Sequence, residues 1–331
     1  MTGAYDRIGV IGAGAWGTAL AQVAAADGRE TLLWAREPDV VASINISREN
    51  AAYLPRVPLS ASIRATTALD DLARCDALLV VTPAQHLRTV LAGLPAGGAA
   101  LILCAKGIEA GTRLLMSEVA AEARPGAPIA VLSGPTFAHE VAAGLPTAIT
   151  LACADPALGA KLADRLARPG FRPYLSEDVI GAEIGGAVKN VLAIACGVVE
   201  GAGLGQNARA ALISRGFAEM TRFGLARGAR IETLAGLSGL GDLVLTCSST
   251  SSRNFSLGKG LGEGRAAGEL LADRRTVAEG AFTAPVLAEA ARGAGVDMPI
   301  VDAVCALLEG RASVSEVIGE LLARPLKSEA A

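Results

Sequence analysis

A single lysine interrupts an apolar stretch that is typical of a buried helix. The segment EIGGAVKNVLAIACG, residues 183–197, is otherwise glycine, alanine, cysteine and aliphatic apart from Glu183 and Asn190. Apolar residues fall on every face at helical spacing, which predicts a largely buried helix from 184 to 199. No carboxylate stands one turn from Lys189 on this helix. Either the lysine snorkels, with its ammonium in solvent, or it meets a counter-charge from elsewhere in the fold or from a ligand.

A glycine-rich turn near the N-terminus has the spacing of a dinucleotide site. The segment IGVIGAGAWGTALA, residues 8–21, reads as an apolar strand, then Gly12, Gly14 and Gly17, then an alanine-rich helix. In this pattern the first glycine permits a tight turn and the second lets a pyrophosphate approach the backbone, while the third lets helix and strand pack closely. A second strand ends about 20 residues further on, which is where such a fold places its ribose contact.

The end of that second strand bears on the choice of cofactor. It reads LLWARE, where an NAD-specific site usually has an acid for the ribose hydroxyls. Here Arg36 stands at that position with Glu37 beside it, and an arginine can accept a 2′-phosphate. NADP and NAD both remain open as cofactors.

Two further segments put polar groups at the ends of expected strands. In LCAKGIE, Lys106 comes just after a strand, at the carboxyl edge where open α/β folds bind ligands. In LSGPTFAHEVAAG, Gly134 and Thr136 lie in a strand-to-helix turn whose N–H groups can hold polar ligand atoms. The alternatives are a solvated loop lysine and an ordinary helix cap.

The segment GLSGLGDLVLTCSSTSSRNFSLG, residues 236–258, combines a glycine-rich turn with a hydroxyl-rich run. It contains Asp242 and leads into Arg253 and Asn254 at an expected helix start. An arginine beside a helix N-terminus, with several hydroxyls, makes a good phosphate receptor. A solvated surface turn has the same composition, so both interpretations stay open here.

The elements that must position these residues fall into two halves. The chain has 331 residues, 51% of them hydrophobic, which is ample for two domains. Short apolar strands alternate with helical stretches in the first half and indicate a parallel sheet covered on both faces; they are RIGVIG, ETLLW, ALLVVT, AALILC, PIAVLSG, TAITLAC and FRPYLS. After about residue 178 we expect helices only, over 179–200, 206–227, 254–263, 278–294, 298–309 and 313–322. The expected fold is therefore α/β, with a parallel-sheet domain over 1–178 and an all-helical domain over 179–331.

Composition excludes several other classes of protein. A net charge of −3 gives no basic field for nucleic acid or anionic membrane. No signal segment or membrane span is evident, so cytoplasm is the expected location. Six scattered cysteines without a CxxC pattern fit buried, reduced thiols. The two histidines, His86 and His139, lack metal-ligand spacing, so we expect no metal.

Taken together, these motifs resemble the NAD(P)-dependent glycerol-3-phosphate dehydrogenases of bacteria. GAGAWGTALA, VVTPAQ, KGIE, LSGPTFAHEV, GGAVKNVLAIACG, the 236–258 segment and TVAEG occur in family order over essentially the whole chain. The resemblance implies a Rossmann domain followed by a helical domain. It also implies reversible reduction of dihydroxyacetone phosphate to sn-glycerol 3-phosphate with NADP or NAD, for glycerophospholipid synthesis. A homodimer is left open.

The resemblance also implies a role for each residue that matches a family motif. Lys189 is implied as the proton donor and acceptor, with Lys106 and Asp242 completing the catalytic group. The implied substrate contacts are Lys106, Gly134, Thr136, Lys189, Asp242, Ser252, Arg253 and Asn254. The implied cofactor contacts are Gly12, Gly14, Ala15, Trp16, Gly17, Arg36, Lys106, Ala138, Arg253, Val277 and Glu279. Many family members have serine where Ala15 and Thr136 stand; the threonine keeps the hydroxyl and adds a methyl group.

The chemistry that the resemblance implies explains why a lysine would stand at position 189. Hydride addition to a ketone carbon makes an alkoxide, which needs a proton from a positioned acid, and Asp242 with the developing oxyanion would supply the counter-charge. Two alternatives compete with this hypothesis. A β-hydroxyacid dehydrogenase also carries a lysine on its first interdomain helix, although the phosphate-like SSRN segment argues against it. A non-catalytic dinucleotide sensor should lack the acid.

Overall fold

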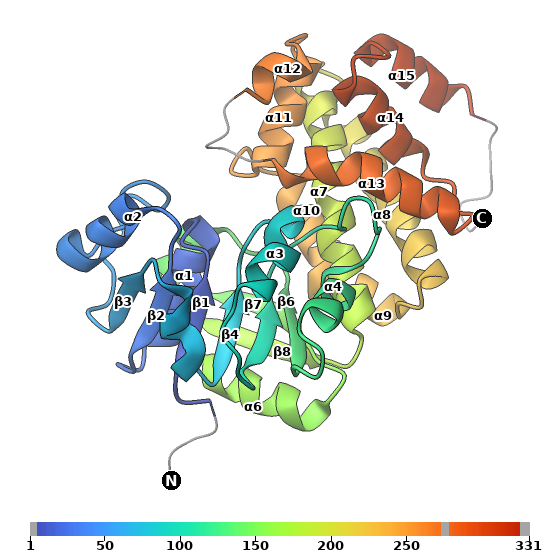
Figure 1. The fold of residues 1–331 in the computed structure, drawn as a ribbon. Helices are drawn as coiled ribbons and strands as arrows, with labels where there is room; N and C mark the ends of the chain where they lie inside the picture. The colour runs from blue at the N-terminus through green and yellow to red at the C-terminus, as the bar shows by residue number, and fades with distance from the viewer. Residues whose placement is uncertain (1–4, 273–277, 325–331) are drawn as a thin grey trace. The chain divides into compact units, whose positions relative to one another are not determined.

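The computed structural model describes residues 5–272 and 278–324 (Figure 1). The chain divides into two compact units. Unit 1 comprises Met1–Gly186 with Gly228–Asp242, and unit 2 comprises Ala187–Arg227 with Leu243–Ala331. Unit 1 therefore takes in a segment from the second half of the sequence, which one boundary at 178 does not describe. The boundary between residues 178 and 179 stays a prediction.

Unit 1 is built on one eight-stranded sheet in the order β3-β2-β1-β4-β5-β6-β7-β8 (Figure 1). The strands are β1 Ile8–Ile11, β2 Thr31–Trp34, β3 Ile63–Thr66, β4 Ala77–Val80, β5 Ala100–Leu103, β6 Ile129–Ser133, β7 Thr147–Ala152 and β8 Phe171–Ser176. Neighbouring strands pair in parallel except β6 with β7, which pair antiparallel. The expected α/β class with a Rossmann-like sheet is confirmed.

Helices cover both faces of this sheet, as continuous apolar strands require. Val10 and Leu79 pack in one buried cluster with side chains of α1 (Ala15–Ala25), α5 (Ala138–Ala142) and α6 (Pro156–Leu166). Their strand neighbours Ile11 and Val80 pack in a second cluster with α3 (Leu87–Ala92) and α4 (Met116–Ala123). Successive residues thus point to opposite faces. The remaining unit 1 elements are α2 Pro38–Ala42, α9 Ile231–Leu234, the 3-10 turns Leu69–Arg74 and Ala84–His86, and the π-turns Ser43–Ser47 and η4 Leu237–Gly241.

Two features of the sheet differ from the sequence-based expectation. Strand β3 was not predicted, because it is not a continuous apolar run: buried Ile63 and Ala65 alternate with exposed Arg64, whereas the predicted four-residue strands are apolar throughout or nearly so. The antiparallel β7 was predicted as a strand but not in its direction. Direction depends on how the chain returns to the sheet, and local composition carries little information about that.

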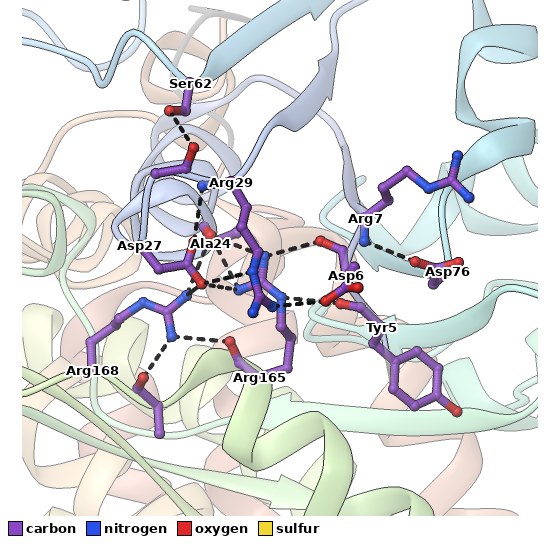
Figure 2. A network of polar contacts seen from close by, with 12 residues as sticks. Tyr5, Asp6, Arg7, Ala24, Asp27, Arg29, Ser62, Asp76, Arg165 and Arg168 are labelled. Carbon is purple, nitrogen blue, oxygen red and sulfur yellow. Dashed lines mark hydrogen bonds and ion pairs between the residues drawn. The ribbon is translucent and has the colours of Figure 1, made fainter. Parts of the chain in front are cut away.

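A network of arginines fixes the C-terminal end of α1 (Figure 2). Arg165, from α6, is 5% exposed and donates to the Ala24 carbonyl at 3.3 Å and to Asp27 Oδ2 at 3.1 Å. Arg168 donates to the same two groups at 3.3 and 3.1 Å. Carbonyls in the last turn of a helix have no helical partner, and cations there complement the helix dipole. The network holds α1 in place from the end opposite to its glycine turn.

Unit 2 is helical throughout the part that the structure describes. Its helices are the later residues of α7 (Val179–Gly201), then α8 Gly205–Ala226, α11 Arg253–Gly262, α12 Ala267–Leu270, α13 Glu279–Gly293, α14 Pro299–Leu308 and α15 Val314–Leu322. A short helix, α10 Asp242–Thr246, begins at the last residue of unit 1. The six predicted helices are confirmed to within two residues at each end, whereas the short α9, α10 and α12 were not predicted.

Helix α7 is long and apolar enough to cross a membrane, yet 83% of that apolar stretch is buried in the protein. Its burial is that of a core helix in a folded protein. All six cysteines are buried as well. Among residues 5–272 and 278–324, no three His, Cys, Asp or Glu side chains gather in a way that could hold a metal ion.

Candidate active site

The glycine turn has the geometry that a bound pyrophosphate needs. Gly12 has φ +109°, and a Cβ there would lie 2.9 Å from the Val81 carbonyl oxygen. A Cβ on Gly17 would overlap the Gly12 carbonyl, so this glycine lets α1 pack on β1. At Gly14, by contrast, a Cβ would meet nothing within 4 Å. The middle glycine therefore faces open space, where a ligand can approach the backbone.

The N-terminus of α1 opens at this turn and is suited to an anion. In the described chain its N-cap, Gly14, has no side-chain cap, and its first turn has no acidic residue. The first N–H groups of a helix have no partner within it and carry the positive end of the dipole. Two side-chain atoms nearby in the fold, Trp16 Nε1 and Thr82 Oγ1, are buried without a hydrogen-bond partner among the described residues. Buried polar atoms are usually bonded, so this edge fits a dinucleotide.

Thr82 was missed as a candidate by the sequence reasoning. It is the second residue after β4, and its backbone nitrogen would lie 3.5 Å from a Cβ on Gly12. The available signal was its place in VVTPAQ, a polar residue right after a fully apolar strand. That position at a carboxyl edge is where ligand contacts gather in open sheets.

Arg36 follows β2, as the ribose-contact position requires. Its side chain is 80% exposed, and Nη2 lies 3.0 Å from Glu37 Oε1. An exposed pair of this kind contributes little to stability, so the guanidinium is available to a phosphate.

The other predicted cofactor contacts lie at helix starts where the structure describes them. Ala138 is the first residue of α5 and Glu279 the first of α13. Val277 lies outside the described residues.

Lys106 lies at the centre of a buried polar cluster in unit 1. Its Nζ is 2.6 Å from Asp242 Oδ2 and 3.2 Å from the Gly134 carbonyl oxygen. The side chains of Lys106 and Asp242 are 14% and 1% exposed. Thr136 Oγ1 also donates to the Gly134 carbonyl, at 3.3 Å. The fold thus brings together four of the predicted substrate residues, and the interpretation of Lys106 as a solvated loop lysine is wrong.

Lys189 is buried in unit 2. It is 7% exposed, and its Nζ donates to Thr246 Oγ1 at 2.8 Å. The snorkelling interpretation is therefore wrong, because the ammonium does not reach solvent along an apolar surface. A buried ammonium is costly unless acceptors surround it, which is the situation expected of a group held ready for chemistry.

The hydroxyl-rich run is a mostly exposed turn as far as Ser251, and it ends in a buried helix start at Ser252. Ser252 is 5% exposed and caps α11, accepting the Phe255 N–H at 3.2 Å. Asn254 is 8% exposed; it donates to Asn190 Oδ1 at 3.0 Å and accepts the Gly280 N–H at 2.9 Å. These two predicted substrate residues therefore also organise the start of α11. Arg253, between them, is exposed.

Glu183 also escaped the sequence reasoning, although it stands in the same segment as Lys189. It is 4% exposed and accepts two hydrogen bonds from Ser117, the backbone N–H at 2.7 Å and the hydroxyl at 2.6 Å. Ser117 is in the first turn of α4, so the carboxylate fastens the first turns of α7 to a helix that covers the sheet.

These features define a class of protein. A helix-covered sheet with a glycine turn, an uncapped helix N-terminus and a buried lysine–aspartate pair is the arrangement of a nicotinamide-dependent dehydrogenase. Residues 7–159 match the family model described as the NAD-dependent glycerol-3-phosphate dehydrogenase N-terminus, and residues 178–319 match the C-terminus of the same family. The chain belongs to the NAD-dependent glycerol-3-phosphate dehydrogenase family.

Individual relatives agree with the family match. A protein of Sphingopyxis alaskensis, named glycerol-3-phosphate dehydrogenase with NAD(P)+ as cofactor, is 66% identical over 98% of both chains. One of the same name from Novosphingobium aromaticivorans is 68% identical over 98% of both chains. The crystal structure of glycerol-3-phosphate dehydrogenase from Coxiella burnetii has a TM-score of 0.91 at 39% identity, covering 96% of this chain and 99% of that one. The predicted resemblance is confirmed, and the β-hydroxyacid dehydrogenase alternative is excluded.

Proposed function

We propose that this chain reversibly reduces dihydroxyacetone phosphate to sn-glycerol 3-phosphate with NADH or NADPH, for glycerophospholipid synthesis. The observation that carries the proposal is the buried Lys106–Asp242 pair in a chain of this family, with its Nζ–Oδ2 distance of 2.6 Å. This pair fixes the Lys106 ammonium at the carboxyl edge of the sheet, where the substrate of an open α/β enzyme binds. A non-catalytic sensor would not need that charge.

The glycine turn and the start of α1, which would hold the cofactor's pyrophosphate, also lie at the carboxyl edge of the unit 1 sheet. Gly12, Gly14, Gly17 and the first turn of α1, with Ala15 and Trp16, would receive the pyrophosphate, and Arg36 would receive a 2′-phosphate. The further proposed contacts are Lys106, Ala138, Arg253, Val277 and Glu279. The reduced nicotinamide supplies a hydride when it is bound.

We propose that Lys189 carries the proton in this reaction. A hydride acceptor that is a ketone becomes an alkoxide, and an ammonium can donate its proton to that oxygen in the same step. In the reverse direction the amine takes the proton back from the alcohol. Thr246, which accepts a hydrogen bond from Nζ at 2.8 Å, would hold the ammonium in one orientation.

Lys106 and Asp242 would have complementary roles. Lys106 would stabilise the negative charge that develops on the carbonyl oxygen, as a fixed cation does in a water-poor site. Asp242 would keep that cation in place and would complete the charge balance. Gly134 and Thr136 would add polar contacts to the substrate hydroxyl.

The phosphate of the substrate would bind at the start of α11. Arg253 is exposed at the first position of that helix, which has ten residues and in the described chain has no acid in its first turn. A guanidinium beside free helix N–H groups suits a phosphate dianion. Ser252 and Asn254 would support this anchor, which orients the carbonyl for reaction.

The direct test is an absorbance assay of cofactor oxidation. NADH or NADPH should be consumed when dihydroxyacetone phosphate is added, and much more slowly with unphosphorylated dihydroxyacetone at equal concentration. Equal rates with both ketones would contradict the phosphate anchor, and no consumption with either would contradict the proposed activity.

We also propose a cytoplasmic location and a homodimer. Six buried thiols suit a reducing compartment. Large apolar side chains of unit 2, Leu225 and Phe282, are 52% and 57% exposed and would be covered in a dimer. Light scattering should give twice the chain mass of 33.3 kDa, whereas a mass of 33.3 kDa would contradict the dimer.

A further inference from the structure

Helix α7 contains two adjacent glycines, and neither is needed for a turn. Gly185 and Gly186 lie well inside a 23-residue helix and are both buried. A glycine inside a helix is about 1 kcal/mol less favourable than alanine. Something that touches the helix at these two positions must therefore exclude a side chain.

At Gly185 the excluded volume belongs to backbone. A Cβ there would overlap the Ser238 carbonyl oxygen and would come within 2.8 Å of the Gly239 Cα. Both residues belong to the π-turn η4, which ends directly before Asp242. Backbone cannot rotate away, so this glycine is a requirement of the fold.

At Gly186 the excluded volume belongs to side chains. A Cβ there would lie 2.9 Å from Ser133 Oγ, 3.2 Å from Lys106 Cγ and 3.5 Å from Lys106 Cδ. Cγ of Lys106 therefore packs against α7 more closely than a side chain at position 186 would normally allow. Beyond that part of the side chain, Nζ reaches Asp242 Oδ2 at 2.6 Å and the Gly134 carbonyl at 3.2 Å.

We propose that Gly186 is a positioning residue for Lys106, and that the space left by its missing side chain sets where the substrate-binding ammonium lies. A methyl group at 186 would push Cγ by a few tenths of an ångström. Nζ is held by two hydrogen bonds at the far end of the same side chain, so a shift at Cγ has to be met by a change in the geometry of at least one of them. This inference rests on the proposed role of Lys106 in binding substrate.

Ser133 helps to separate this effect from simple crowding. Its Oγ is buried without a hydrogen-bond partner among the described residues, so removing it should not destabilise the protein. In Ser133→Ala the contact of 2.9 Å at Gly186 disappears, while the contact of 3.2 Å with Lys106 stays.

The test is a double-mutant cycle between positions 186 and 106, measured with dihydroxyacetone phosphate. Gly186→Ala should raise the KM for this substrate by about tenfold, which is less than the roughly 100-fold cost of a full 1 Å misplacement because the expected shift is a fraction of an ångström. The KM for NADPH should stay unchanged. In a Lys106→Met background, which keeps the aliphatic chain but has no ammonium to misplace, Gly186→Ala should add no further change in KM. Protection of the protein against heating by dihydroxyacetone phosphate should follow the same pattern.

Two controls complete the design. Gly319→Ala changes a helical glycine in α15 whose Cβ would meet nothing within 4 Å, and it should leave every KM unchanged. If Gly186→Ala folds poorly, Ser133→Ala/Gly186→Ala should restore folding while the raised KM remains.

Each failure has its own signature. An unchanged KM in folded Gly186→Ala, equal effects in the wild-type and Lys106→Met backgrounds, or a normal KM in Ser133→Ala/Gly186→Ala would overturn the positioning role. A normal KM in Lys106→Met would instead overturn the proposed function of Lys106, which the Gly186 result alone does not test.

Discussion

Replacing Asp242 by asparagine tests the charge pair at the proposed substrate edge with almost no change in shape. Asp242 is 0% exposed as a residue, and Lys106 Nζ lies 2.6 Å from its Oδ2. Two unit charges at that distance attract by about 6 kcal/mol at an effective dielectric constant near 20. Much of this is offset by the desolvation of both groups, so the pair's net contribution is smaller.

The expected loss of stability comes from the Lys106 ammonium, which loses its charged partner in Asp242→Asn. Removing one partner of a buried ion pair costs about 3 to 5 kcal/mol. The Lys106 side chain is 14% exposed, which lets some water reach the remaining ammonium. The asparagine can also still accept a hydrogen bond. We therefore expect Asp242→Asn to lower the free energy of unfolding by about 2 to 3 kcal/mol, below the usual range.

The assay combines urea unfolding with steady-state kinetics. Asp242→Asn should show the stability loss together with a raised KM for dihydroxyacetone phosphate, because Lys106 is no longer held. Glu263→Gln is the matched control, since it breaks the exposed pair with Lys259, whose side chains are 42% and 46% exposed. That change should stay within about 0.5 kcal/mol. A variant Asp242→Asn as stable as the control, with a normal KM, would refute the reasoning.

Two other predictions concern cofactor choice and pH. Arg36→Ala should weaken NADPH by about 1.5 to 3 kcal/mol, the range for a hydrogen bond to a charged group, and should leave NADH nearly unchanged; equal loss of affinity for both would contradict the 2′-phosphate contact. Glu219, which accepts N–H groups of Ile300 and Val301 and lies near Arg222 and Asp297, has its pKa raised from 4.5 to about 7, mainly by burial. Because the folded state holds this proton more tightly, stability should fall by roughly 3 kcal/mol as pH rises from 4.5 through 7. Urea unfolding of Glu219→Gln should lack that part of the pH dependence, and an identical pH dependence in both proteins would contradict it.

Local patterns predicted most of the fold. The glycine spacing around Gly12 identified the first strand, turn and helix, because each position in that motif requires a residue without a side chain. Long apolar or periodic segments predicted seven strands and six helices, which the structure contains. Strand β3 and helix α9 were not predicted, since each is only four residues long and neither is a continuous apolar run like the four-residue strands that were predicted.

Contacts between residues far apart in the chain could not be predicted from local sequence patterns. Lys106 and Asp242 are 136 residues apart, and only the resemblance to a known family put them in one site. The antiparallel β7 and the return of Gly228–Asp242 to unit 1 depend on chain tracing rather than composition. The contact between Gly186 and Lys106 depends on how α7 packs against β6 and the segment after β5, and no local sequence pattern predicts it.

The most direct test of the account is the turnover of Lys189→Met. Methionine is a good helix former of similar length, and it removes a buried charge rather than creating one, so the melting temperature should be unchanged or raised. NADPH affinity should also stay close to that of the wild type. If Lys189 transfers the proton, kcat should fall by about 10²- to 10⁴-fold in that folded protein. A kcat near that of the wild type, with normal folding and NADPH affinity, would contradict the catalytic role of Lys189.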